Sequence, residues 1–215
     1  MPSESLHRLH FFERIAPHYD FLVDLLTFGL YARFLRKAVR ILDPGQGETI
    51  LDLCSGTGRV ASWIGQSVGE NGRVVGMDIA ETMVEIAGSR YGNYGNLIFL
   101  RQDVTHPWNY QGKLDAIFTS FSVHELPKDG RMRTLKQSFG TLNEKGRMVI
   151  ADFNPQISGP GRVLVQIFFG IFERPNLNFL SFKQEDMLRG IGFKTIQTFP
   201  VASGLFQITL ARKSG

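Results

Sequence analysis

Short apolar runs alternate with amphipathic stretches through the middle of this chain. Five runs are predicted to be strands, because they are rich in Val, Ile, Leu and Phe and are bounded by turn residues. These runs are Thr49–Leu53, Arg73–Asp78, Leu97–Arg101, Leu114–Ser120 and Arg147–Phe153. Apolar residues at helical spacing follow the first two runs and recur over Gly130–Leu142. This alternation predicts βα units that build a parallel sheet.

The two ends of the chain depart from this alternation. Near the beginning, Leu6–Ile15 and Phe21–Leu42 show helical spacing, and Asp20 is a natural N-cap for the second of these predicted helices. Towards the other end, Phe193–Phe199 and Leu205–Ala211 alternate as strands around a short turn, which predicts an antiparallel hairpin. The expected fold class is α/β, with a doubly wound, mostly parallel sheet of seven strands that ends in an antiparallel C-terminal hairpin.

Length and composition fit one soluble domain. The chain has 215 residues, of which 43% are hydrophobic and 20% charged, close to the averages of globular proteins. No apolar run is long enough to span a membrane, and the amino terminus lacks the pattern of a secretory signal, so we expect a cytoplasmic protein. The single cysteine, Cys54, excludes an internal disulfide, and we predict no metal site.

The basic residues form one notable cluster. The formal net charge of +4 permits an anionic partner without requiring one. The cluster comprises Arg33, Arg36, Lys37 and Arg40, on a stretch with apolar residues at helical spacing. This pattern indicates an amphipathic helix with a solvated basic face, and it leaves open a peripheral contact with a membrane surface.

The motif with the most chemical content follows the first predicted strand. Residues 52–58 read Asp-Leu-Cys-Ser-Gly-Thr-Gly, and a Gly-x-Gly turn at the end of a strand lets the backbone approach a ligand. The second strand ends in Asp78, where a carboxylate can accept from two ribose hydroxyls. Ala61 stands where a dinucleotide site has its third glycine, and Asp52 would repel a pyrophosphate but suits a sulfonium or amino group. These residues favour S-adenosylmethionine over NAD.

With these motifs the chain resembles the class I S-adenosylmethionine-dependent methyltransferases, and most of all the ubiquinone and menaquinone biosynthesis C-methyltransferases. The resemblance extends from about Phe12 to Pro155 and includes the leader Phe-Glu-Arg-Ile-Ala-Pro-His-Tyr-Asp and the segment Gly-Met-Asp-Ile-Ala-Glu-Thr-Met. After Ser120-Phe121 the quinone enzymes usually continue with a Gly-Leu-Arg-Asn type segment. Here residues 122–127 read Ser-Val-His-Glu-Leu-Pro, so the chain departs from the family pattern at that point.

The resemblance implies a set of cofactor contacts at the carboxyl ends of the strands. Asp103 would accept from the adenine amino group and the Val104 amide would donate to a ring nitrogen, although Asp103 could instead cap the following turn. Ile79 and Met83 would press on the adenine ring, or simply belong to the helix core. The predicted cofactor-binding residues are Tyr19, Asp52, Ser55, Gly56, Thr57, Gly58, Asp78, Ile79, Met83, Asp103, Val104 and Ser120.

Methyl transfer itself asks for positioning, desolvation and removal of a proton from the acceptor. His124 is the candidate catalytic base, because it follows the fourth strand and because imidazole titrates near neutrality. The alternative is a loop histidine that is hydrogen-bonded to backbone.

Aromatic residues are dense between Val163 and Phe182, where the family places an insertion over the active site. This density predicts an apolar acceptor, unless the aromatics form ordinary core or a subunit interface. We expect one methyltransferase domain over residues 1–215. Its parts are a helical leader or cover (1–42), which carries Phe21, Phe28 and Phe34, a cofactor-binding core (49–155), an acceptor-side insertion (156–192) and the hairpin (193–212).

The favoured function is methyl transfer from S-adenosylmethionine to a small lipophilic acceptor, with methylation of a quinone ring carbon as the leading form. The alternatives are phospholipid N-methylation and a cofactor-binding regulatory protein without turnover. No nucleic-acid partner is expected, because the Asn/Asp-Pro-Pro-aromatic segment of amino-methylating enzymes is missing after the fourth strand. The sequence does not choose between carbon, oxygen and nitrogen as the accepting atom, and it does not determine the oligomeric state.

Overall fold

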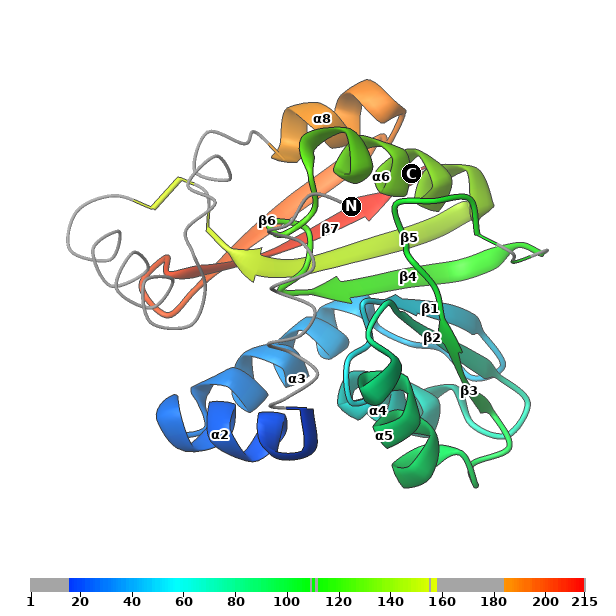
Figure 1. Cartoon of the computed structure of the whole chain (residues 1–215). Helices are drawn as coiled ribbons and strands as arrows, with labels where there is room; N and C mark the ends of the chain where they lie inside the picture. The colour runs from blue at the N-terminus through cyan, green and yellow to red at the C-terminus, as the bar shows by residue number, and fades with distance from the viewer. Residues whose placement is uncertain (1–15, 109, 111, 155, 158–183, 215) are drawn as a thin grey trace.

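The computed structural model describes residues 16–108, 110, 112–154, 156–157 and 184–214, and a seven-stranded sheet runs through its centre (Figure 1). The strands are β1 (Thr49–Leu53), β2 (Arg73–Asp78), β3 (Leu97–Arg101), β4 (Leu114–Ser120), β5 (Leu142–Phe153), β6 (Thr195–Val201) and β7 (Phe206–Arg212). Their order across the sheet is β3-β2-β1-β4-β5-β7-β6. The helices are η1 (Ala16–His18), α2 (Tyr19–Leu26), α3 (Leu30–Leu42), α4 (Arg59–Val68), α5 (Glu81–Tyr91), α6 (Lys128–Thr141) and α8 (Gln184–Ile191).

The strand pairing confirms the expected fold class. Strands β1 to β5 are parallel to one another, whereas β7 is antiparallel to both β5 and β6. The first four strands have the bounds that the apolar runs predicted. Strand β5 begins at Leu142, five residues before the predicted start, because the polar turn-like residues 143–146 continue the extended backbone.

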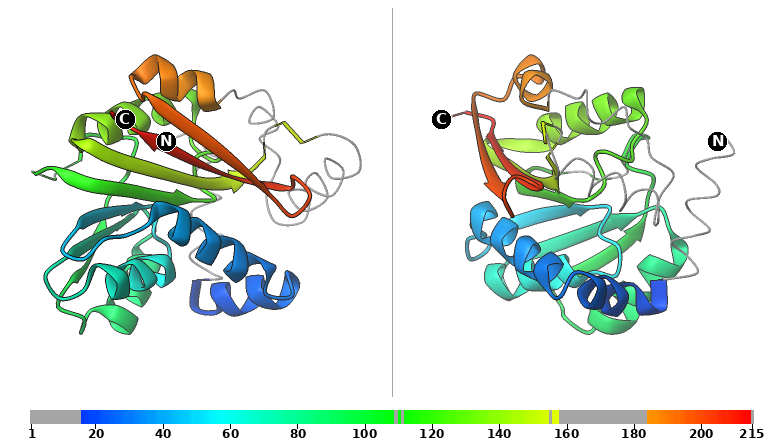
Figure 2. Two further views of the ribbon diagram at one scale, coloured as in Figure 1. Left: turned by 180° about the vertical axis from the view of Figure 1, so that it is seen from behind. Right: turned by 90° about the vertical axis from the view of Figure 1, so that its left-hand side faces the viewer.

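Helices cover both faces of the sheet, with α3, α4 and α5 on one side and α6 and α8 on the other (Figures 1 and 2). The neighbouring residues Ile117 and Phe118 of β4 are both fully buried, and they belong to the two opposite cores. A strand buried on both faces has apolar residues at successive positions. That requirement explains why β1, β2 and β4 are continuous apolar runs.

The leader differs from the prediction in two ways. The single helix expected over Phe21–Leu42 is wrong, because Phe28 (φ 50°) and Gly29 (φ 74°) adopt left-handed backbone angles that end α2 before α3 begins. Asp20 is not the N-cap, because α2 starts at Tyr19 and places Asp20 in its first turn. The predicted helix Leu6–Ile15 lies outside the described residues.

Helix α8 was not expected from the sequence, which assigned its residues to the acceptor-side insertion. Leu188 of α8 is fully buried and belongs to the core that α6 and β4 also line. The helix therefore completes the layer over this face of the sheet. The aromatic-rich segment Val163–Phe182 lies outside the described residues.

Candidate active site

The glycine turn connects β1 to α4 at the carboxyl end of the sheet. The Ser55 amide donates to the Met77 carbonyl of β2 at 2.9 Å, and the Gly58 amide donates to the Ser55 carbonyl at 3.0 Å. A Cβ on Gly58 would lie 2.8 Å from the Phe99 ring, so this glycine allows close packing. A Cβ on Gly56 would meet nothing within 4 Å. The turn is therefore open at Gly56, and this is where a ligand can approach the backbone.

Asp78, at the end of β2, holds this turn in place. Its Oδ2 accepts a hydrogen bond from the Gly56 amide at 2.8 Å, and its Oδ1 accepts one from the Ala80 amide at 2.9 Å. Burial raises the pKa of this carboxyl, although these backbone bonds partly oppose the shift. A carboxylate offers about four acceptor positions, so two amides leave capacity for the ribose hydroxyls that the sequence predicted.

Asp52 of β1 is the second buried carboxylate. Only 2% of its surface is exposed, and its Oδ2 accepts no hydrogen bond from any residue that the structure describes. Burial, and then the charge of Asp78, raise the pKa of Asp52 well above its ordinary value. A buried carboxylate oxygen without a partner is unfavourable unless a ligand supplies one. The arrangement fits a ligand with a cationic group, as the ammonium and sulfonium of S-adenosylmethionine would provide.

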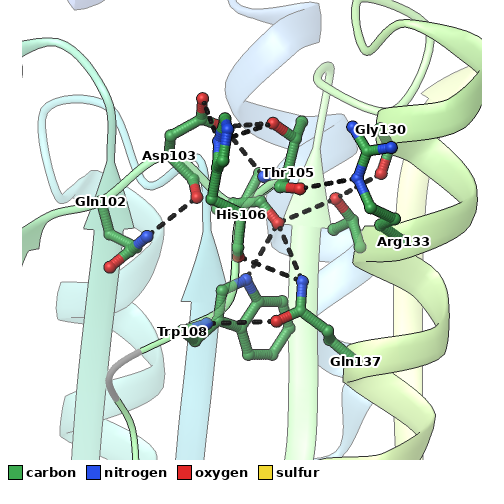
Figure 3. Close-up of polar contacts among 10 residues, drawn as sticks. Gln102, Asp103, Thr105, His106, Trp108, Gly130, Arg133 and Gln137 are labelled. Atoms are coloured by element: carbon green, nitrogen blue, oxygen red, sulfur yellow. Dashed lines mark hydrogen bonds and ion pairs between the residues drawn. The ribbon is translucent and has the colours of Figure 1, made fainter.

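The loop after β3 holds Asp103 (Figure 3). Asp103 Oδ1 accepts from the backbone and hydroxyl of Thr105 at 2.9 and 2.7 Å, and its Oδ2 lies 2.9 Å from His106 Nδ1. Burial would raise the pKa of Asp103, but the Thr105 and His106 contacts outweigh it and the pKa is lowered. The side chain thus caps the turn, as the alternative prediction had it, and stays ionised for a further hydrogen bond.

Side chains of helix α6 hold the same loop. The Val104 carbonyl accepts from Trp108 Nε1 at 2.9 Å and from Thr134 Oγ1 at 3.0 Å, while Arg133 Nε donates to the Thr105 carbonyl at 3.0 Å (Figure 3). The loop backbone is therefore set before any ligand binds. Sequence reasoning missed Arg133 and Thr134, because their partners lie 28 and 30 residues earlier in the chain.

The leader packs against the helix that follows β2. Tyr19, which is half-buried, contacts a small apolar cluster in which Met83 of α5 is almost fully buried. Ile79 is also half-buried, beside Asp78. The structure thus brings Tyr19, predicted to cover the cofactor, beside Met83, predicted to press on the adenine ring, although Met83 lies mostly in the interior.

Asp20 connects the leader to the glycine turn. Its carboxylate accepts from Thr57 Oγ1 at 2.9 Å, and it forms ion pairs with Arg90 of α5 at 2.6 Å and with Arg59 of α4 at 3.4 Å. Arg59 also pairs with Asp24 of α2 at 2.9 Å. Sequence reasoning gave Asp20 only a capping role, because these partners become neighbours only in the folded chain.

His124 lies just beyond β4 and is buried against β5. Its Nδ1 is 2.6 Å from Oδ1 of Asp152, and its backbone amide donates to Oδ2 of the same carboxylate at 3.2 Å. Its Nε2 is 3.7 Å from Glu125 Oε1. This contact favours the tautomer in which Nδ1 carries the ring proton and donates it to the Asp152 carboxylate. The structure therefore gives this histidine a carboxylate partner.

An aromatic cluster adjoins His124 at the same end of the sheet. The ring of Phe153 packs edge-on to the His124 ring, with 5.4 Å between centroids. Phe121, held at a left-handed φ of 46°, follows Ser120 and stacks on Tyr31 at 5.1 Å. The members of the cluster are Tyr31, Phe34, Phe121, Phe153 and Phe206. Phe34, predicted to cover the acceptor, is instead buried in this cluster.

Other chemistries find little support in the described part of the chain. Its His, Cys, Asp and Glu side chains form no group of three or more that could hold a metal ion. Burial raises the pKa of the Cys54 thiol, which makes a reactive thiolate at the turn unfavourable. None of its helices combines the length and the apolar character needed to cross a bilayer.

The strand order and the antiparallel β7 define the Rossmann-like fold of the S-adenosylmethionine-dependent methyltransferases. A methyltransferase from Thermotoga maritima superposes with a TM-score of 0.73 at 20% identity and covers 95% of this chain and 99% of its own. The structure of DhpI in complex with S-adenosylhomocysteine gives a TM-score of 0.71 at 17% identity. Coverage there is 100% of this chain and 98% of that one.

Sequence comparison identifies the family. The chain belongs to the ubiE/COQ5 methyltransferase family, whose model matches residues 3–200. It is similar to the 2-phytyl-1,4-naphtoquinone methyltransferase of Thermosynechococcus vestitus, with 30% identity over 94% of this chain and 97% of that relative. The ubiquinone/menaquinone biosynthesis C-methyltransferase of Haemophilus ducreyi is 29% identical over 69% of this chain and 58% of its own length.

Proposed function

We propose that this methyltransferase acts on a ring carbon of a lipophilic quinol. The observation that carries the proposal is the His124–Asp152 pair, with the Phe153 ring of the aromatic cluster packed against His124. A proton acceptor beside apolar side chains is what methylation of a quinol ring would need. The Thermosynechococcus vestitus relative, which aligns with this chain over nearly the full length of both, acts by its name on a 2-phytyl-1,4-naphtoquinone. A phytyl-substituted ring needs an apolar pocket, and aromatic side chains supply one.

The cofactor would be held by the residues around the glycine turn. Asp78 would accept from the ribose hydroxyls, Asp52 would face the cationic groups, and the open side of Gly56 would receive the ligand. When bound, S-adenosylmethionine supplies a methyl group on a positively charged sulfur. Tyr19 and Met83 would cover the adenine. Asp103 would accept a hydrogen bond from its amino group, and the Val104 amide would donate one to a ring nitrogen. Ser55, Thr57, Gly58, Ile79 and Ser120 complete the proposed set of contacts.

His124 would move the proton that ring methylation releases. A quinol hydroxyl that gives its proton to Nε2 raises the electron density of the ring carbon beside it, and that carbon later loses its own hydrogen as a proton. The imidazolium that forms is stabilised by Asp152 at Nδ1 and by Glu125, 3.7 Å from Nε2. The aromatic cluster, of which Phe153 contacts His124, would exclude water from this proton transfer.

A labelling experiment tests the proposal. The protein is incubated with methyl-labelled S-adenosylmethionine and, in detergent with dithionite, a polyprenyl naphthoquinol that lacks the ring methyl group. We expect label at a ring carbon of the reoxidised product, identified by mass spectrometry. Label in phosphatidylethanolamine supplied in parallel would instead support the N-methylation alternative. S-adenosylhomocysteine binding without any labelled product from either acceptor would support a regulatory protein.

A further inference from the structure

The charged and apolar residues of helix α2 lie on the opposite sides from those usual for a surface helix. Its acidic residues face the protein, because Asp20 pairs with Arg90 and Thr57, and Asp24 pairs with Arg59. Four of its apolar residues, Phe21, Leu22, Leu25 and Leu26, are exposed, and no residue of the helix is buried. A surface helix in a globular protein normally shows the reverse arrangement. The outer side of α2 is therefore better matched to an apolar partner than to water.

The exposed apolar surface continues through the break between α2 and α3. Phe28 is 89% exposed at its left-handed φ, Phe21 is 67% exposed and Leu25 is 58% exposed. The apolar patch consists of Phe21, Leu22, Leu25, Leu26, Phe28 and Leu30. Over the described residues, the other exposed large apolar side chains are Tyr94, Ile98 and Leu100, near β3. Contiguous patches of this kind mark interaction sites, whereas scattered residues do not.

A basic stripe adjoins the apolar patch on the next helix. Arg33, Arg36 and Arg40 are exposed, Lys37 is half-buried, and the opposite side of α3 is buried in the core. Residues 30–42 contain no acidic side chain that would neutralise the stripe. Helices α2 and α3 lie together at the outside of the molecule, away from α6 and α8 (Figures 1 and 2).

We propose that this apolar patch and the basic stripe dock the protein on the surface of an anionic bilayer. Aromatic and leucine side chains that enter the headgroup region beside lysines and arginines are the usual means of interfacial binding. A second copy of the chain fits less well, because a two-fold contact through this patch would bring two basic stripes together. The inference rests on the proposed function in one respect, since a quinol with a long apolar tail resides in the bilayer.

Vesicle cosedimentation tests the docking surface. We expect the wild-type protein to bind vesicles of phosphatidylglycerol and phosphatidylcholine, to bind pure phosphatidylcholine vesicles weakly, and to dissociate as salt is raised. Phe28→Ser should lower the partition coefficient about tenfold, because one aromatic ring leaves the bilayer. The pair Arg33→Glu and Arg40→Glu should abolish the preference for the anionic lipid. Tyr94→Ser, which changes an aromatic residue 53% exposed on another surface, should bind like the wild type.

Two outcomes would overturn the inference and leave the proposed function intact. The first is a wild-type protein that methylates the naphthoquinol in detergent but does not bind anionic vesicles. The second is a dimer in sedimentation velocity that Leu25→Ser dissociates, without vesicle binding, which would assign the patch to a second copy. Vesicle binding that Phe28→Ser weakens, in a protein that methylates no quinol, would support the docking surface and overturn the proposed function.

Discussion

The hydroxyl of Thr57 donates a hydrogen bond of 2.9 Å to Asp20, 37 residues earlier in the chain. Thr57 belongs to the glycine turn and Asp20 to the helical leader, so one bond joins the two parts that the cofactor would lie between. Arg59 and Arg90 add ion pairs to the same carboxylate. The position of the leader is therefore coupled to the conformation of the turn.

Asp20→Ala should weaken S-adenosylhomocysteine binding by about 1–2 kcal/mol, because charge-assisted hydrogen bonds to the turn are lost. Calorimetry measures the affinity, and limited proteolysis should show faster cleavage within α2. Asp24→Ala is the matched control, since Asp24 pairs with Arg59 but has no bond to Thr57. Equal affinity and equal cleavage for both variants would contradict the coupling.

Asp52 should make both stability and cofactor affinity depend on pH. Burial and Asp78 raise the pKa of its carboxyl. Its contribution to the free energy of unfolding is therefore most favourable below the ordinary pKa and declines as pH rises towards the raised value. A bound cation favours the ionised form, so affinity should increase with pH over the same window and binding should release protons.

Asp52→Asn should remove that dependence. The apoprotein should melt at a higher temperature than the wild type at pH 8, while S-adenosylmethionine affinity falls by about tenfold to a hundredfold. Melting curves across pH, and calorimetry in buffers of different ionisation enthalpy, measure the two effects. A variant that keeps the wild-type pH dependence of both stability and affinity would show that this dependence arises at a group other than Asp52.

Asp78→Ala should lower S-adenosylhomocysteine affinity by roughly 2–4 kcal/mol, since it removes the proposed ribose acceptor and the support of the Gly56 amide. Asp115→Ala is a suitable control, because Asp115 accepts from the Thr49 amide at 2.9 Å in a purely structural role. That control should lose stability and keep the affinity of its folded fraction. Equal calorimetric affinity for Asp78→Ala and the wild type would remove Asp78 from the site.

His124→Ala should lower turnover about a hundredfold and leave cofactor affinity nearly unchanged. Asp152→Asn should shift the acidic limb of the kcat profile to lower pH, because the carboxylate that favours imidazolium is gone. Asp152→Glu should restore part of the activity. A fall in kcat without any change in the pH profile would instead indicate that Asp152 has only a packing role.

The two glycines of the turn should respond differently to alanine. Gly58→Ala should lower the free energy of unfolding by about 1–3 kcal/mol, because its Cβ would lie 2.8 Å from Phe99 and 2.9 Å from Ala87. Gly56→Ala should cost only about 1 kcal/mol through its left-handed φ, yet weaken cofactor binding more strongly. Chemical denaturation and calorimetry together separate the two effects. If Gly58→Ala weakened cofactor binding more than Gly56→Ala, the ligand would have to contact the turn at Gly58 instead.

The sheet could be predicted because strands such as β1 and β4 carry their signal locally, as apolar runs that both cores require. The break between α2 and α3 could not be predicted, because the helical spacing of apolar residues continues through Gly29 and gives no sign of its left-handed backbone. The partnership of His124 with Asp152 spans 28 residues, and only the pairing of β4 with β5 creates it. The acceptor assignment of Val163–Phe182 remains a prediction.

The placement of β7 between β5 and β6 has a consequence for biosynthesis. While the chain is being translated, β1 to β5 can pair in order, but the outer side of β5 has no neighbour until residues 206–212 leave the ribosome. An unpaired strand edge invites association with other chains. The edge of β5 thus stays unpaired while β6 is synthesised. Chaperones that bind unpaired strand edges should contact the nascent chain during that interval.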